Sequence, residues 1–130
     1  MKEGANAMCA QLRPTKMPRL SLADLRCIDQ AIIYISKNYI EKISADQLSI
    51  EVCISKEKLQ AGLQLRTGQT LAKYIQQIRL QKAKEILVNT NDPVKAVAGA
   101  AGFVNESHFC KVFKKVHFIS PVQFRYQQAL

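Results

Sequence analysis

Hydrogen-bonding side chains gather on one face of a predicted helix that runs from Glu106 to about Val116. Its inward face is set by apolar residues at three- and four-residue steps, namely Phe109, Val112, Phe113 and Val116. The outward face then carries Glu106, Ser107, His108, Cys110, Lys111, Lys114 and Lys115. Lysine can donate to guanine O6 and N7 or to a phosphate, glutamate can accept from cytosine N4, and histidine can do either. This face has the chemistry to read base edges in a DNA groove, with a solvated charged face as the simpler alternative for Lys114 and Lys115.

A second polar face is expected on a predicted helix from Lys56 to about Arg66, where Leu59 and Leu63 point inward. Its outward residues are Lys56, Glu57, Lys58, Gln60, Ala61 and Gln64. Gln60 can pair bidentately with adenine, whereas Ala61 can only touch a thymine methyl group. We therefore expect this face to discriminate among bases less than the first one.

Polar residues precede these helices in the positions of N-terminal caps. Ser55 is expected to cap 56–66, Asn105 to cap 106–116, and Ser120 to precede a last helix that begins at Pro121. Backbone N–H groups at such helix starts can hold phosphates.

Four further helices are predicted, over about 21–39, 45–52, 70–89 and 94–101, with Asp92 capping the last of them and Pro93 in its first position. No strand pattern competes, so the sequence predicts an all-α chain of about seven helices. The long helix should bury Leu71, Tyr74, Ile75, Ile78, Ala83, Ile86 and Leu87. The last helix should pack through Val122, Phe124 and Tyr126.

The two polar helices belong to a weak internal repeat, in which a short helix and a tight turn precede each of them. The helix over 70–89 joins the two units and should be ~30 Å long at ~1.5 Å per residue. That length is close to the ~34 Å between successive major-groove segments on one DNA face. We predict a flexible tail or linker at 1–20, a first helix-turn-helix lobe at 21–69, the linker helix at 70–89 and a second lobe at 90–130.

The charge balance favours a polyanionic partner. The 130 residues carry a net charge of +9. Residues 20–55 contain more acids than bases, and the excess of lysine and arginine resumes at Lys56, where the first polar helix begins. A basic surface of this kind suits nucleic acid, although it also serves solubility.

Other chemistries lack the residues that they require. Cys9, Cys27, Cys53 and Cys110 have no zinc-binding spacing, and the absence of a signal-like opening segment favours reduced thiols in the cytoplasm. A redox role for Cys110 is less expected than a small polar filler. His117 should be a charge partner at a helix C-terminus. No catalytic triad, P-loop or paired-carboxylate pattern occurs, so we expect no enzyme, no metal and no cofactor.

The residues over about 22–128 resemble the DNA-binding domain of AraC/XylS-type bacterial transcription activators. The second half carries that family's signature in order and with its spacing: Val97-Ala98, Ala101-Gly102-Phe103, Phe109, Phe113-Lys114-Lys115, Ser120-Pro121 and Phe124-Arg125. The first half matches its more variable repeat at Leu48, Ser55, Leu59, Gly68, Tyr74, Arg79-Leu80, Ala83 and Leu87. The resemblance also directs Glu106, Ser107, His108, Cys110 and Lys111 towards the groove, and implies a structural role for Arg79.

The chain departs from the family pattern at two places. Phe118 stands where the family usually has glycine before Ser-Pro. In the first polar helix, Ala61 and Leu63 replace the usual arginine and phenylalanine, and Gly62 costs the helix up to ~1 kcal/mol relative to alanine. The first recognition helix is therefore expected to hold DNA more than it reads it.

The resemblance implies a bacterial, cytoplasmic, nucleoid-associated regulator of promoter DNA that activates transcription through RNA polymerase. It also implies a separate effector or dimerisation domain, and nothing in 130 residues is long enough to be one. The chain is then either a stand-alone small regulator or a fragment. The alternative from another class is a helical protein-interaction module with a basic surface for an acidic partner. RNA binding is less favoured, because no exposed aromatic platform for base stacking is evident.

Overall fold

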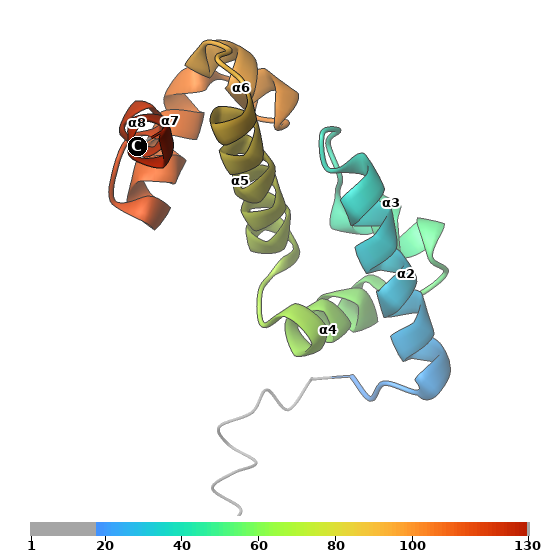
Figure 1. Cartoon of the computed structure of the whole chain (residues 1–130). Helices are drawn as coiled ribbons and strands as arrows, with labels where there is room; N and C mark the ends of the chain where they lie inside the picture. Colours follow the sequence, from blue (N-terminus) through green and yellow to red (C-terminus); the bar gives the residue numbers. More distant parts are fainter. Residues whose placement is uncertain (1–17, 130) are drawn as a thin grey trace, which may run out of the picture. The chain divides into compact units, whose positions relative to one another are not determined.

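The computed structural model describes residues 18–129, which form seven helices and no strand. These helices are α2 (Leu22–Asn38), α3 (Ala45–Glu51), α4 (Lys56–Thr67), α5 (Leu71–Asn89), α6 (Val94–Ala100), α7 (Glu106–His117) and α8 (Pro121–Ala129) (Figure 1). The predicted all-α fold is confirmed. Most of the tail predicted at 1–20, including Cys9, lies outside the described residues.

The described chain divides into two compact units. The first contains residues 18–33 and Ser44–Leu71, and the second contains Tyr34–Ile43 and the chain from Ala72 onwards. The last turn of α2 and nearly all of α5 thus belong to the second unit, whereas the sequence suggested a first lobe up to residue 69 and a separate linker helix.

The helix starts follow the capping chemistry of the sequence. Ser21 and Asp24 form a reciprocal capping box, in which each backbone N–H donates to the other side chain at 2.9 and 3.0 Å. Ser44 accepts from the N–H of Gln47 at 3.1 Å. At α6 the prediction was wrong by one residue: Pro93 itself occupies the cap, extended at φ −62° and ψ 153°, and Asp92 does not cap the helix.

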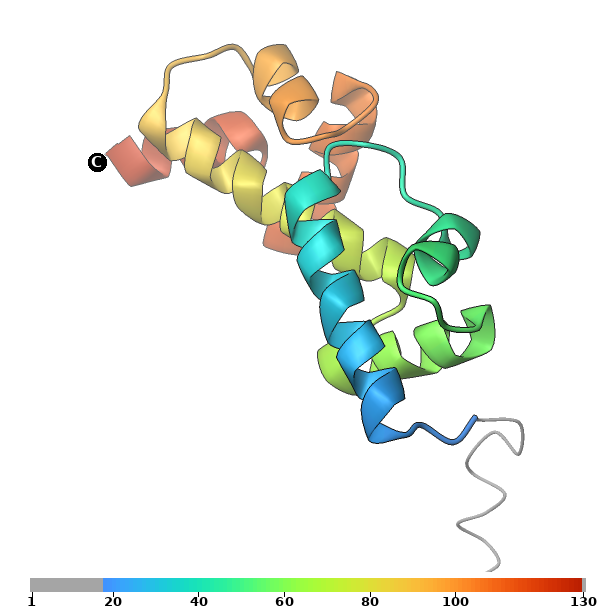
Figure 2. The same cartoon turned by 90° about the vertical axis from the view of Figure 1, so that its right-hand side faces the viewer.

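The first unit buries Ile28, Ala31, Leu48, Leu59 and Leu63 completely. α4 crosses α2 (Figure 2). The two helices lie close together at Gly62, where an added Cβ would overlap Cγ1 and Cδ1 of Ile28. Gly62, which is unfavourable for the helix itself, is therefore needed for the packing of α4 on α2. An ion pair between Arg66 Nε and Asp29 Oδ1 at 3.2 Å joins the same two helices near the surface.

The second unit has an aromatic core on which α7 is anchored. The Phe109 ring lies 5.0 Å from that of Phe103 and 5.7 Å from that of Phe113, and Phe113 lies 5.6 Å from Phe124 on α8. Leu80, Ala83 and Leu87 of α5, together with Val97, Ala98 and Ala101, complete this core. Because Phe109 and Phe113 are fully buried, the opposite face of α7 has to point outward.

Several predicted packing positions were wrong. Leu80 is only 4% exposed and was missing from the expected stripe on α5. Val116, Val122 and Tyr126, which were expected to pack inward, are 47%, 45% and 68% exposed. Pro121, not the apolar residue after it, fills the core at the start of α8. Helical periodicity gives the direction of a side chain but not whether a neighbour covers it.

Arg79 fixes the end of α2 within the second unit. Its guanidinium donates from Nε to the Tyr39 carbonyl at 2.7 Å and from Nη2 to the Glu41 carbonyl at 3.0 Å. Gly102, at φ +98°, lies against this contact, since an added Cβ would be 3.0 Å from Arg79 Nε and from Ile40 Cα. The arginine therefore has a structural role, as the resemblance implied, and burial lowers its pKa.

Candidate nucleic-acid interface

The exposed face of α7 presents most of the side chains that the sequence assigned to it. Asn105 caps the helix by accepting from the N–H of His108 at 2.7 Å. The face consists of the exposed residues Glu106, Ser107, His108, Lys111, Lys114 and Lys115. Cys110 is only partly exposed, and burial, with a smaller contribution from Glu106, raises the pKa of its thiol. That shift disfavours the thiolate, which supports the filler role over the redox one.

The three exposed lysines of α7 have no acidic partner among the described residues. Lys111, Lys114 and Lys115 form no ion pair with any residue that the structure describes. The helix C-terminus also favours cations, since the backbone dipole places partial negative charge there. Glu106 lies in the first turn of α7, so this face can attract a polyanion mainly from Lys111 to Lys115.

The equivalent lysines of α4 are held by acids of their own unit. Lys56 Nζ lies 3.3 Å from Asp46 Oδ1, and Lys58 Nζ lies 3.1 Å from Asp24 Oδ2. The pKa of Asp24 is lowered, first by the hydrogen bond from the Ser21 N–H and then by the one from Lys58. Both lysines are thus partly neutralised before any ligand arrives.

The remaining α4 candidates are uncharged except for Glu57. Gln60 and Gln64 are exposed, and Ala61 is partly buried. Ser55 caps the helix by accepting from the N–H of Lys58 at 3.2 Å. The candidate residues therefore form two sets, one in each unit, and only the α7 set carries free cations among the described residues. Their contacts with DNA stay a prediction.

Ser120 belongs to a capping box with Gln123. Its N–H donates to Gln123 Oε1 at 2.9 Å, and its Oγ accepts from the Gln123 N–H at 3.1 Å. A phosphate at this helix start would have to compete with these hydrogen bonds or use the neighbouring N–H groups. The cap is present, and the phosphate contact stays a prediction.

A groove between α5 and α7 brings residues of α5 beside the candidate site, among them Lys73, which the sequence predicts to be solvated or phosphate-facing. Its volume is 520 Å³, and its apolar part comes from Ala72, Val112 and Val116. Its polar residues are Lys73, Gln76, His108, Lys111 and Lys115. Lys73 and Gln76 lie three residues apart and thus share one face of α5, but periodicity cannot show which helix that face meets.

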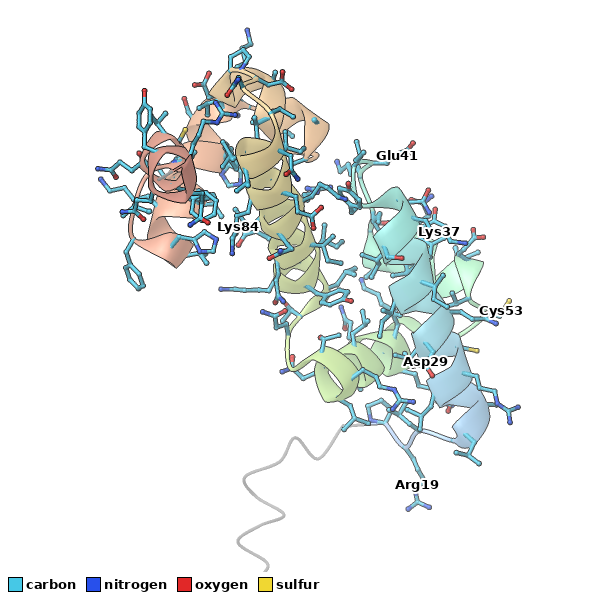
Figure 3. The ribbon with its side chains drawn as sticks, in the orientation of Figure 1. Arg19, Asp29, Lys37, Glu41, Cys53 and Lys84 are labelled. Carbon is cyan, nitrogen blue, oxygen red and sulfur yellow. The ribbon has the colours of Figure 1, made fainter. Side chains whose placement is uncertain are left out.

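The surroundings of His117 disfavour the charge that the sequence assigned to it. Its ring lies 4.6 Å from that of Phe113, and burial, followed by the nearby charge of Lys84, lowers its pKa. Lys84 lies on α5, with its Nζ 5.7 Å from the centre of the Phe124 ring (Figure 3). This environment disfavours the imidazolium, so it argues against the prediction that His117 is a charged partner at the C-terminus of α7.

Among the described residues, two other than glycine adopt a left-handed backbone conformation, and both are exposed. Phe118 follows α7 at φ 68° and is 84% exposed. Cys53 lies in the turn between α3 and α4 at φ 58°, and its side chain projects away from the ribbon (Figure 3). Cys27, Cys53 and Cys110 are free thiols. Glycine would adopt either conformation without strain, and neither Cys53 nor Phe118 has a buried side chain that would explain why it occurs there instead.

The described residues contain no cluster of three or more His, Cys, Asp or Glu side chains that could hold a metal ion. Within the same part of the chain, no helix combines the length and hydrophobicity that a membrane span requires.

Two helix-turn-helix pairs, α3–α4 and α6–α7, with a cationic second helix, define a DNA-binding class of fold. A family model described as a helix-turn-helix domain matches residues 48–127. The chain belongs to the AraC/XylS family of helix-turn-helix transcriptional regulators.

The relatives and solved structures agree with this membership. The chain is 33% identical over 120 residues to the bifunctional transcriptional activator and DNA repair enzyme AdaA of Bacillus subtilis, covering 90% of this chain and 54% of AdaA. It thus spans about half the length of that curated relative. An AraC-type regulator from Chromobacterium violaceum has the same fold, with a TM-score of 0.75 at 24% identity over 84% of this chain and 97% of the other. The DNA-binding domain of the transcription factor AdpA, solved with a target DNA, gives a TM-score of 0.72 at 18% identity over 77% and 90%.

Proposed function

We propose that this chain binds duplex promoter DNA by sequence and thereby regulates transcription. The observation that carries the proposal is the exposed face of α7, where three lysines without acidic partners among the described residues lie beside Glu106, Ser107 and His108. Membership of a transcriptional regulator family supports it. The DNA present in the AdpA structure supports the use of this fold for the same purpose.

The two units should contribute unequally to recognition. α7 presents free lysines and a glutamate that can distinguish base pairs, so it should determine most of the sequence preference. α4 presents lysines already paired with Asp24 and Asp46, together with Gln60 and Gln64. We infer that α4 contributes contacts to a second, adjacent major-groove segment and adds less discrimination there.

Regulation is proposed to be activation, because AdaA is named a transcriptional activator. Contact with RNA polymerase, a nucleoid location in the cytoplasm and an effector or dimerisation domain are proposals of the same kind. A direct test is transcription in vitro from a promoter carrying the selected site, with and without the chain. Increased transcription supports activation, and a decrease would instead assign repression.

Selection from a random duplex library tests the DNA-binding proposal. We expect an enriched motif that spans two major-groove segments, and Lys111→Ala should weaken binding to it by about 1–3 kcal/mol while relaxing base preference at one end. The matched control is Lys95→Ala, which removes an exposed lysine from α6 and should preserve the preference.

Absence of any enriched motif, together with an unchanged affinity of Lys111→Ala for duplex DNA, would overturn the proposal. Retention of an acidic protein ligand by the same preparation would then favour the helical interaction module.

A further inference from the structure

The groove between α5 and α7 is lined by three lysines, one histidine and one glutamine. Lys73 and Gln76 come from α5, and His108, Lys111 and Lys115 come from α7. None of its described lining residues is acidic. Its polar groups can therefore act as donors towards one anion without a carboxylate to repel it.

The lining of the groove suits a phosphodiester better than a base. Its apolar lining consists of Ala72, Val112 and Val116, whose side chains offer no acceptor or donor for a base edge. Lysine ammonium groups are flexible point charges that neutralise phosphate without reading sequence. A sugar-phosphate segment would place its sugar against these apolar side chains and its charge among the lysines.

We propose that this groove is a phosphate site that holds one DNA strand by its backbone, with Lys73 and Lys115 as the two neutralising cations and Gln76 as a hydrogen-bond donor. The inference deepens the proposed function, and it rests on that function. It places part of α5 in the DNA interface. It also assigns Lys115 to the DNA backbone, whereas Lys111 contributes to base preference.

Lys114 and Lys115 provide a matched pair within α7. Both are exposed, both lie in its last turn and neither has an ion pair among the described residues. Only Lys115 lines the groove. Substitution of either lysine removes the same charge from the same helix. A difference in DNA binding between the two variants is therefore caused by the position in the groove and not by the net charge.

The experiment compares Lys115→Ala, Lys73→Ala and Lys114→Ala with the unaltered chain by fluorescence anisotropy on a fixed duplex between 50 and 200 mM salt. Lys115→Ala and Lys73→Ala, the two groove variants, should each lower the slope of log affinity against log salt by about 0.9. Over this fourfold range of salt, each variant should therefore lose about 3.5-fold less affinity than the unaltered chain does. Lys114→Ala should lower it by much less. Base preference in the random-library selection should be unchanged for both groove variants.

A neutral methylphosphonate scanned along each strand identifies the phosphate concerned. At one linkage, the methylphosphonate should lower the affinity of the unaltered chain and of Lys114→Ala for the duplex. The same methylphosphonate should lower the affinity of Lys115→Ala little further. Circular dichroism spectra of all variants verify that α7 remains folded.

A separate measurement distinguishes DNA from a free anion as the source of the phosphate. If inorganic phosphate in the millimolar range raises the melting temperature of the unaltered chain but not of Lys115→Ala, and no linkage shows the coupled loss, the site is for a free anion and the proposal is overturned. Equal salt slopes for Lys114→Ala and Lys115→Ala would also overturn it. If the chain selects no motif but Lys114→Ala and Lys115→Ala still differ in salt slope, sequence-specific regulation is refuted and the phosphate site in the groove is still supported.

Discussion

Gly62→Ala should destabilise the first unit, although alanine is the better helix former. The substitution stabilises an exposed helix by up to ~1 kcal/mol. Here the new methyl group would overlap Cγ1 and Cδ1 of Ile28, which is fully buried and has to move within a packed core. Overpacking of this kind costs about 1–3 kcal/mol. The steric cost exceeds the helix gain, and the free energy of unfolding should fall by about 1 kcal/mol.

Urea unfolding followed by circular dichroism measures this change, and hydrogen exchange of the α2 and α4 amides assigns it to the first unit. Gly99→Ala is the control, since Gly99 lies in α6 with nothing within 4 Å of an added Cβ. That substitution should raise stability, by at most ~1 kcal/mol. In Gly62→Ala combined with Ile28→Ala, the added methyl fills part of the cavity, so the double variant should be more stable than the sum of the single effects. The clash between Gly62 and Ile28 is refuted if Gly62→Ala stabilises the chain as Gly99→Ala does, or if the effects of Gly62→Ala and Ile28→Ala on stability simply add.

Three further outcomes follow from the same structure. Phe118→Gly should raise the free energy of unfolding by up to ~1 kcal/mol, because it relieves a left-handed φ of 68° and removes a ring that is 84% exposed. Phe118→Ala keeps the backbone strain, so it should not raise the melting temperature. Burial lowers the pKa of His117, so the unfolded chain binds this proton more tightly than the folded one, and stability is lost as the pH falls below about 6.5. His117→Asn should therefore flatten the decline in melting temperature between pH 7.5 and 5.5, and an unchanged decline would contradict this assignment. Asp24→Asn should free Lys58 and steepen the salt dependence of duplex binding by up to about 0.9, and an unchanged slope would show that this lysine stays away from phosphate.

The helices were predictable because their signals are local. Ser55 and Asn105 each accept from an N–H three residues ahead, and Gly68 ends α4 at φ 73°, so neighbouring residues alone specify these boundaries. The exposed set on α7 was predictable for a similar reason, since burial of Phe109 and Phe113 fixes the opposite face. The family signature then identified the fold.

The remaining features depended on which elements meet. The pairing of Lys58 with Asp24 and of Lys56 with Asp46, the contact of Gly62 with Ile28, and the groove containing Lys73 and Lys115 all join residues from different helices. Periodicity gives each side chain a direction around its own helix but does not identify the neighbour in that direction.

The sequence by itself determined the helices, the caps of α4 and α7, the helix-turn-helix repeat and the cationic face of α7, because these follow from local hydrogen bonding and helical periodicity. The tertiary structure alone decided which lysines are neutralised, why Gly62 is needed, and that α5 supplies part of the candidate interface. These properties depend on distances between residues far apart in the chain, and such distances exist only once the helices have packed.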